Sequence, residues 1–206
     1  MALHELRKND GCDVVALLTT VTEDYGRVSM HGIRESLLDR QAECLGLPLE
    51  KVYVKKDSSN EEYEARMGET LARLRGQGIL SVAFGDIFLE DVRRHREEKL
   101  AGAGMKAIFP RWKRQTDTSA REFIRLGFKA IITCVDTDAL DTRFVGRDFD
   151  EAFLSDLPAN VDPCGENGEF HSFVYDGPIF KEPIRFTKGE IVLREKRFCY
   201  CDLLPW

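Results

Sequence analysis

Two glutamates in a glycine-rich loop are the residues of this 206-residue sequence best suited to chemistry. They lie in the run Gly165-Glu166-Asn167-Gly168-Glu169, directly before an alternating apolar segment at 170–175. Glycines let a backbone approach a ligand closely, and carboxylates on such a loop can bind a cation, orient an amine or transfer a proton. We therefore predict that Glu166 and Glu169 are catalytic. The alternative is an ordinary solvated turn with acidic residues.

Two of the four histidines are candidates for proton transfer or ligand binding. His31 follows a polar loop at 23–27, in a position expected to lie over a ligand pocket, and we predict a catalytic role for it. His171 lies in the strand after the glutamate loop, where it is either a proton shuttle or a structural histidine. His4 is expected on a helix surface, and His95 lies in a charged run.

Strands and helices alternate through the first two thirds of the chain, which predicts an α/β fold with a doubly wound parallel sheet. Apolar runs and capping signals place strands at 13–21, 52–55, 79–84, 107–109 and 129–135, and helices at 33–45, 61–75, 88–100 and 116–126. A smaller α+β region follows, with a helix at 148–157 and strands at 170–175, 184–187 and 190–195. We predict a nucleotide-binding domain at 1–135 and a substrate-binding region at 136–206.

Ligands of open parallel sheets bind beyond the carboxyl ends of the strands. Thr19, Gly85 and Asp86 lie at such ends. Asp86 is placed to contact Mg²⁺ or a ribose, or else to cap the following helix. Arg147 could hold a phosphate or a carboxylate, and the alternative is an ion pair with Asp148 or Asp150.

Composition narrows the class of protein. The net charge of −6 argues against a nucleic-acid partner, although basic clusters occur at 93–96 and around Trp112 at 111–114. Solvated helix surfaces are the simpler interpretation of both clusters. No 18-residue apolar run or signal peptide is evident, and the six cysteines include no CxxC pair. We expect a cytoplasmic protein with reduced thiols and no membrane partner.

Several ordered motifs resemble one known family. The chain is similar to the diphthine–ammonia ligase (diphthamide synthase-like) ATP-binding family, within the PP-loop ATP pyrophosphatase superfamily. The matching segments are Met30-His31-Gly32-Ile33, residues 41–49, Phe109-Pro110-Arg111-Trp112, residues 126–129, Gly146-Arg147, residues 165–170 and residues 174–180.

The resemblance implies a HUP-type, Rossmann-like nucleotide fold and ATP-dependent amide formation. A carboxylate is activated as an acyl-adenylate and is then attacked by ammonia, with ATP and Mg²⁺ required. The acceptor is a small molecule or a protein-borne carboxylate, and a homo-oligomer is left open. With the strand-end positions, the resemblance leads us to predict nucleotide binding by Thr19, Met30, Gly85 and Asp86. We predict substrate binding by Trp112, Arg147, Gly165, Gly168 and His171.

Two departures from the family pattern affect this expectation. The family's Ser-Gly-Gly-Lys-Asp-Ser phosphate loop and the strand before it have no counterpart, and the residues after Met1 already resemble the helix that follows that loop. We expect an internal start within a longer reading frame or, alternatively, a catalytically inactive nucleotide-binding paralogue. Asn167 and His171 replace a glycine and a glutamate, as in bacterial members, so a cobalamin-related acceptor is an alternative to diphthine. A tRNA-modifying ATP pyrophosphatase is the other alternative function.

Overall fold

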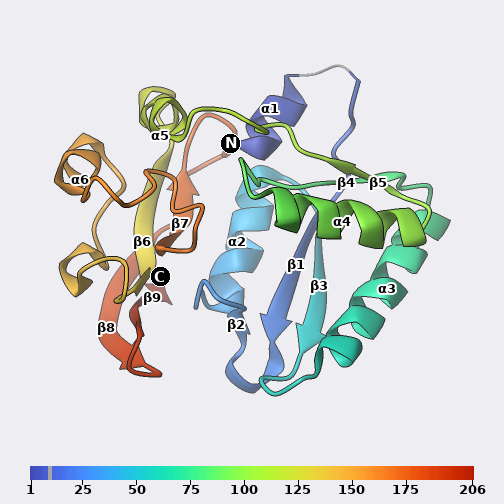
Figure 1. The fold of residues 1–206 in the computed structure, drawn as a ribbon, viewed down its shortest axis with the longest axis horizontal. Coiled ribbons are helices and arrows are strands. Elements are labelled where there is room, and N and C mark those ends of the chain that lie inside the picture. The colour runs from blue at the N-terminus through green and yellow to red at the C-terminus, as the bar shows by residue number, and fades with distance from the viewer. Residues whose placement is uncertain (9–10) are drawn as a thin grey trace.

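A computed structural model describes residues 1–8 and 11–206 as a mixed α/β protein with parallel strands and flanking helices (Figure 1). The first sheet has the order β2-β1-β3 and contains β1 (Leu17–Thr22), β2 (Arg27–Val28) and β3 (Leu49–Val54). β1 and β3 are parallel, and Leu17 is opposite Leu49. A second, two-stranded parallel sheet pairs β4 (Ser81–Ala83) with β5 (Lys106–Ile108).

Six α-helices in the described chain flank these sheets. They are α1 (Ala2–Arg7), α2 (Glu35–Leu45), α3 (Asn60–Gly76), α4 (Glu90–Gly102), α5 (Thr116–Arg125) and α6 (Glu151–Asp156). Ser59 begins α3 with a reciprocal capping box, in which its hydroxyl accepts from the Glu62 amide and the Glu62 side chain accepts from the Ser59 amide. Gly46 ends α2 with a left-handed φ of 69°.

The third sheet is antiparallel and has the order β7-β6-β9-β8. It contains β6 (Lys129–Asp136), β7 (Phe170–Asp176), β8 (Phe186–Arg194) and β9 (Phe198–Pro205). The expectation that 129–135 continues a parallel sheet was wrong, because β7 and β9 return antiparallel on either side of β6. Residues 184–187 and 190–195 were expected to be two strands joined by a turn. This was also wrong, because β8 continues through this region with an irregularity between Lys188 and Ile191.

The parallel strands do not form one continuous sheet among the described residues. β1 pairs with β2 and β3, whereas β4 pairs with β5, and no described strand joins the two sets. In place of the doubly wound sheet predicted from the alternation, the structure has two separate parallel strand pairs, β1–β3 and β4–β5, and β2 is antiparallel to β1. The HUP identity of the fold and the division at residues 135/136 stay predictions.

The main hydrophobic core lies between α2 and the antiparallel sheet. It joins Ile33 and Leu37 to β6, every residue of which after Lys129 is buried, and to Phe144 and Phe153. In Figure 1, α2 lies between this sheet and the β1–β3 sheet. The side-chain amide of Gln41 donates to the carbonyl of Val174 at 2.7 Å, so α2 is also tied to β7 by a hydrogen bond.

Candidate functional site

The loop between Asp162 and Glu169 is shaped by its own carboxylates. One Asp162 side-chain oxygen accepts from the amides of Cys164 and Glu166, at 2.9 and 3.2 Å. Glu169 is 5% exposed and accepts from the amides of Asp162 and Asn167 and from the Asn167 side chain, at 2.9 to 3.0 Å. Buried polar groups need such partners. In this structure the Glu169 carboxylate therefore bonds to the loop itself.

The two predicted loop glycines both have left-handed backbones, with φ of 68° at Gly165 and 88° at Gly168. A Cβ at Gly165 would lie 2.7 Å from the carbonyl oxygen of Phe170, so a side chain there would force the loop off the start of β7. Gly165 is thus needed for the close return of the chain.

Glu166 connects this loop to the segment between β4 and α4. Its carboxylate accepts from the amide of Ile87 at 2.5 Å. Burial raises the pKa of Glu166, the amides of Ile87 and Phe88 partly offset that rise, and the nearby Asp86 carboxylate adds to it. Glu166 is thus a half-buried carboxylate. It lies in the loop before β7, and its contact with Ile87 places it beyond the carboxyl end of β4.

His31 and His171 lie against each other. Their ring centroids are 4.6 Å apart and the rings are tilted by 38°. The buried Thr133 hydroxyl of β6 lies 3.2 Å from the carbonyl oxygen of His31 and 3.3 Å from that of His171, so it connects the two segments. A Cβ at Gly32 would be 2.7 Å from the Tyr200 ring, which explains the glycine after His31.

Both imidazoles are uncharged near neutral pH. Burial and, to a smaller extent, the neighbouring His31 together lower the pKa of His171 to about 4. Burial of the ring within the protein also lowers the pKa of His31, although the residue as a whole is exposed. The His31 Nδ1 lies 3.3 Å from the Ser29 carbonyl, which favours a proton on Nδ1 and a lone pair on Nε2. The pair can therefore accept protons or hydrogen bonds.

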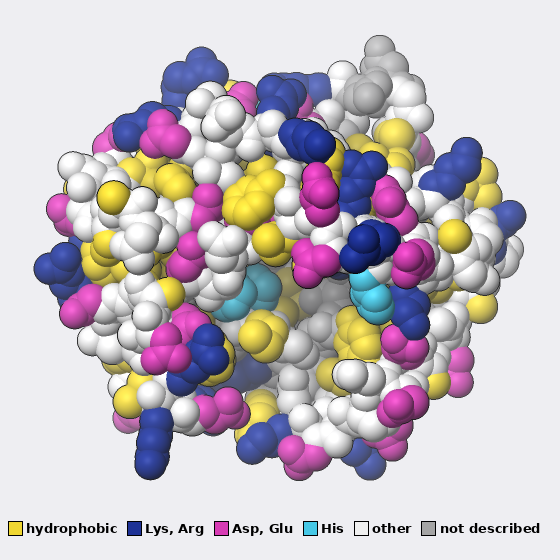
Figure 2. Space-filling model, in the orientation of Figure 1, with side chains coloured by type: hydrophobic (Ala, Val, Ile, Leu, Met, Phe, Trp, Pro, Cys, Tyr) yellow, Lys and Arg dark blue, Asp and Glu magenta, His cyan; other side chains and the backbone are white. Residues whose placement is uncertain are grey.

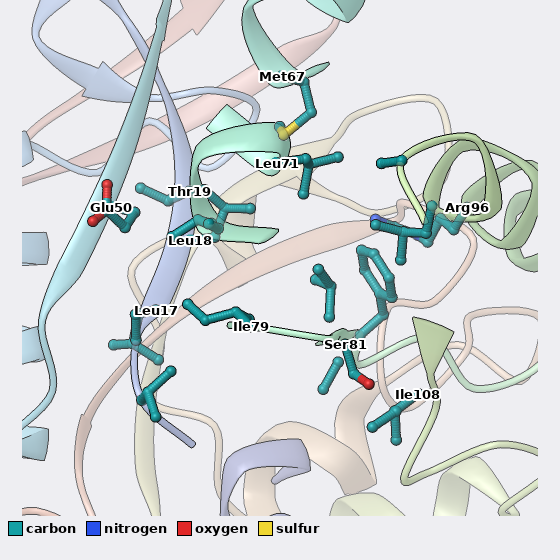
Figure 3. Close-up of a pocket in the computed structure, with 18 of the residues that line it drawn as sticks. Leu17, Leu18, Thr19, Glu50, Met67, Leu71, Ile79, Ser81, Arg96 and Ile108 are labelled. Carbon is teal, nitrogen blue, oxygen red and sulfur yellow. The ribbon is translucent and has the colours of Figure 1, made fainter. Parts of the chain in front are cut away.

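A cavity of about 1640 Å³ lies between β1, β4, α3 and α4. Figure 3 shows Leu17, Leu18 and Thr19 along one side, with Ile79, Ser81 and Ile108 across from them and Met67 and Leu71 from α3 between the two sides. His31 and His95 also line it. The surface is hollowed near the centre of Figure 2, with histidine side chains at the edge of the hollow.

The predicted nucleotide-binding residues are not all in this cavity. Thr19 lines it, whereas Met30 is 60% exposed and has a left-handed φ of 65°. Gly85 is exposed, and Asp86 forms an ion pair with Arg96 at 3.2 Å. Arg96 itself lines the cavity and lies over the Phe84 ring at 4.3 Å. No cluster of three or more metal-binding side chains occurs at residues 1–8 or 11–206.

Two predicted substrate-binding residues lie elsewhere. Arg147 pairs with Asp156 at 2.8 Å, and its guanidinium lies over the rings of Phe144 and Phe153. Its partner is therefore an aspartate of α6, not the two aspartates considered from the sequence. Trp112 packs near Phe109, and the Arg93 guanidinium lies 4.6 Å from the centre of its ring. Their substrate roles stay predictions.

Sequence reasoning missed three residues that organise the site. They are Thr133, Asp162 and Asp202, which accepts from Arg27 at 2.8 Å and from Arg34 at 2.6 Å. A threonine inside an otherwise apolar strand was a signal for Thr133, and an aspartate before proline was a signal for a turn at Asp162. Nothing local marks Asp202, because its partners lie more than 160 positions away in the chain.

Comparison with known proteins covers nearly the whole chain. The diphthamide synthase N-terminal domain matches residues 1–107, and the diphthamide synthase C-terminal domain matches residues 115–203. The chain belongs to the diphthamide synthase family. This confirms the resemblance found in the motifs.

Curated relatives of this diphthamide synthase family member carry the name diphthine–ammonia ligase. The Schizosaccharomyces pombe protein is 27% identical over 201 residues, which is 88% of this chain and 33% of that protein. The human protein is 27% identical over 185 residues, which is 82% of this chain and 67% of that protein. The mouse protein is 29% identical over the same length and shares. The chain thus spans about a third of the fission yeast relative and about two thirds of the mammalian ones.

None of the helices in the described part of the chain combines the length and the apolar character needed to cross a membrane. All six cysteines are free in this structure. The cytoplasmic location stays a prediction.

Proposed function

We propose that this family member is an ATP-dependent ligase that converts a carboxylate into an amide with ammonia. The observation that carries the proposal is the match to both diphthamide synthase domains, in order, within one chain. We assign the nucleotide to the part before residue 135 and the acceptor to the part after it. His31 and His171 are placed where the two parts meet.

The reaction has two balanced steps. An oxygen of the acceptor carboxylate attacks the α-phosphorus of ATP and pyrophosphate leaves. Ammonia then attacks the acyl carbon, AMP leaves, and the nitrogen gives up a proton. The uncharged His31 imidazole is suited to accept that proton, and His171 is suited to orient ammonia through a hydrogen bond.

The cavity supports nucleotide binding by its size and lining. It exceeds the 300–1,000 Å³ or so that small-molecule sites usually occupy. Leu18 and Val82 offer apolar contacts for a base, while Thr19 offers a hydroxyl and Arg96 a cation for phosphate. Mg²⁺ would be bound chiefly through phosphate oxygens and water.

The acceptor is the least determined part of the proposal. The relatives' name specifies diphthine, and Asn167 and His171 depart from the pattern of diphthamide-forming members. We propose a carboxylate on a cationic or zwitterionic acceptor, because the loop that would lie beside it is rich in carboxylates, with Asp162, Glu166 and Glu169.

The test is an assay of amide formation with ATP, ¹⁵N-ammonium and a diphthine-containing peptide, followed by mass spectrometry and by release of AMP. Acceptor-dependent AMP release with incorporation of ¹⁵N is the expected result. His31→Gln should lower kcat at least tenfold, whereas His95→Gln, at the same cavity, should not. If AMP is released but none of the tested carboxylates gains ¹⁵N, the ligase function is rejected.

A further inference from the structure

The tip of the 162–169 loop is attached to residues 87–88 by the Glu166 carboxylate, and the Cys164 thiol at its base also contacts the Thr116 carbonyl at 3.3 Å. Asp162 and Glu169 use their side chains within the loop, so they set its shape. Glu166 reaches outward instead and accepts from the Ile87 amide at 2.5 Å. Shape and attachment are thus carried by different residues.

The segment that receives Glu166 is held firmly in place. The Ile87 side chain is 7% exposed, and its carbonyl accepts from the Lys113 amide at 2.7 Å. The amide of Phe88 also hydrogen-bonds to the Glu166 carboxylate. Because both amides precede α4 and cannot turn away, the contact with Glu166 forms or breaks by movement of the loop.

The charges around Glu166 are mostly of its own sign. Asp86 belongs to the receiving segment and Asp162 to the loop, and both oppose the ionised form of Glu166. Arg96 of α4 pairs with Asp86 and reduces that repulsion. Cys164 is a protonated thiol, because burial raises its pKa to about 12. The attachment therefore combines two amide donors with neighbouring carboxylates of the same charge, which oppose the ionised form of Glu166.

We propose that Glu166 is a positioning residue that latches the 162–169 loop onto residues 85–88, and that the latch opens as the pH falls. A carboxylate accepts from an amide more strongly than a carboxylic acid does, so protonation weakens the contact. Only the purpose of the latch, which is to hold the acceptor loop beside the carboxyl end of β4, rests on the proposed function.

The test follows the Ile87 amide by NMR between pH 4 and pH 8 in three proteins. In the wild type, the amide signal should shift with a midpoint above that of an ordinary glutamate, about 4.3. Glu166→Gln removes the charge, so its Ile87 signal should stay near the low-pH position of the wild type and should not change with pH. Glu166→Ala should abolish the contact and raise the hydrogen-exchange rate of Ile87 at least tenfold. Glu98→Gln, on the exposed surface of α4, is the matched control.

Two results would overturn the latch. One is an Ile87 amide that keeps its protection in Glu166→Ala, and the other is a wild-type signal that does not change with pH. These measurements need no ATP or acceptor, so they remain decisive even if the ligase assay fails. If the ligase is active, Glu166→Gln and Glu166→Ala should both lower kcat at neutral pH, because both weaken the latch.

Discussion

At the scale of single residues, one buried hydroxyl links the two candidate histidines. Thr133 is 1% exposed and lies within hydrogen-bond distance of the carbonyls of His31 and His171. Replacing it with valine leaves both carbonyls without this donor. We expect Thr133→Val to lower the free energy of unfolding by about 1–2 kcal/mol.

Urea unfolding would measure that loss, and Thr187→Val, on the exposed surface of β8, is the control. Hydrogen exchange at residues 30–32 should also increase, because the hydroxyl holds this segment to β6. An unchanged exchange rate there would show that the loop is positioned by Gly32 and Tyr200 alone.

His171 should make stability depend on pH. Its pKa is lowered from 6.5 to about 4 by burial, so the unfolded chain binds a proton that the folded protein does not. The contribution of neutral His171 to the free energy of unfolding is fully present above pH 6.5 and is lost as the pH falls toward 4. The upper bound of this loss is roughly 3 kcal/mol. His171→Gln should flatten the unfolding free energy across this interval, whereas the exposed His95→Gln should leave the slope intact.

Glu169 is expected to matter for stability before it matters for catalysis. Three donors of the loop bond to its carboxylate, and a glutamine would direct its amide hydrogens at one of them. Glu169→Gln should lower the free energy of unfolding by about 1–3 kcal/mol, with the exposed Glu190→Gln as control. If stability is unchanged while amide formation is lost, Glu169 has the catalytic role predicted from the sequence.

At the scale of elements, Asp202 fastens β9 to β2 and to the start of α2. Hydrogen bonds from Arg34 and Arg27 hold its pKa far below 3.8, even though burial opposes this. The stabilisation is present above pH 3.8 and is lost only in stronger acid. Asp202→Asn should lower the free energy of unfolding by about 1–3 kcal/mol, whereas Asp156→Asn, in the exposed pair with Arg147, should cost less than about 1 kcal/mol.

Elements with strong local signals were predictable. The apolar spacing and Gly46 defined α2 to within two residues. A capping residue at 58–60 and the glycines at 76 and 78 defined α3 to within one residue. The pairing of β6 was not predictable, because its apolar run is equally typical of a parallel strand and of a central antiparallel one. Which neighbours flank such a strand depends on β7 and β9, which lie 34 or more positions later.

In the candidate site, too, only the features with local sequence signals were predictable. The glycines and carboxylates of the 162–169 loop could be recognised, since loop chemistry is local. The direction of each carboxylate could not, because Glu166 meets Ile87 across 79 positions. His31 could be selected from its place after a strand, but its contact with His171 depends on how two sheets pack.

At the scale of the whole molecule, stability should be uneven. β6 is buried along its length and is paired on both sides, whereas β4 is partly exposed and pairs on one side in the described chain. We expect amides of Ala130–Asp136 to exchange with deuterium at least a hundredfold more slowly than those of Ser81–Ala83, because local opening is easiest where contacts are few. Equal rates would show that the two halves unfold as one unit.

The position of β9 beside β6 also affects how the protein is made. β6 leaves the ribosome about 60 residues before its neighbour β9, so at roughly 5–20 residues per second it waits several seconds with one edge unpaired. Asp202 lies in the same late strand, so Arg27 and Arg34 wait for their partner even longer. During that interval the nascent chain exposes an apolar strand edge, which makes this a step where a chaperone would bind.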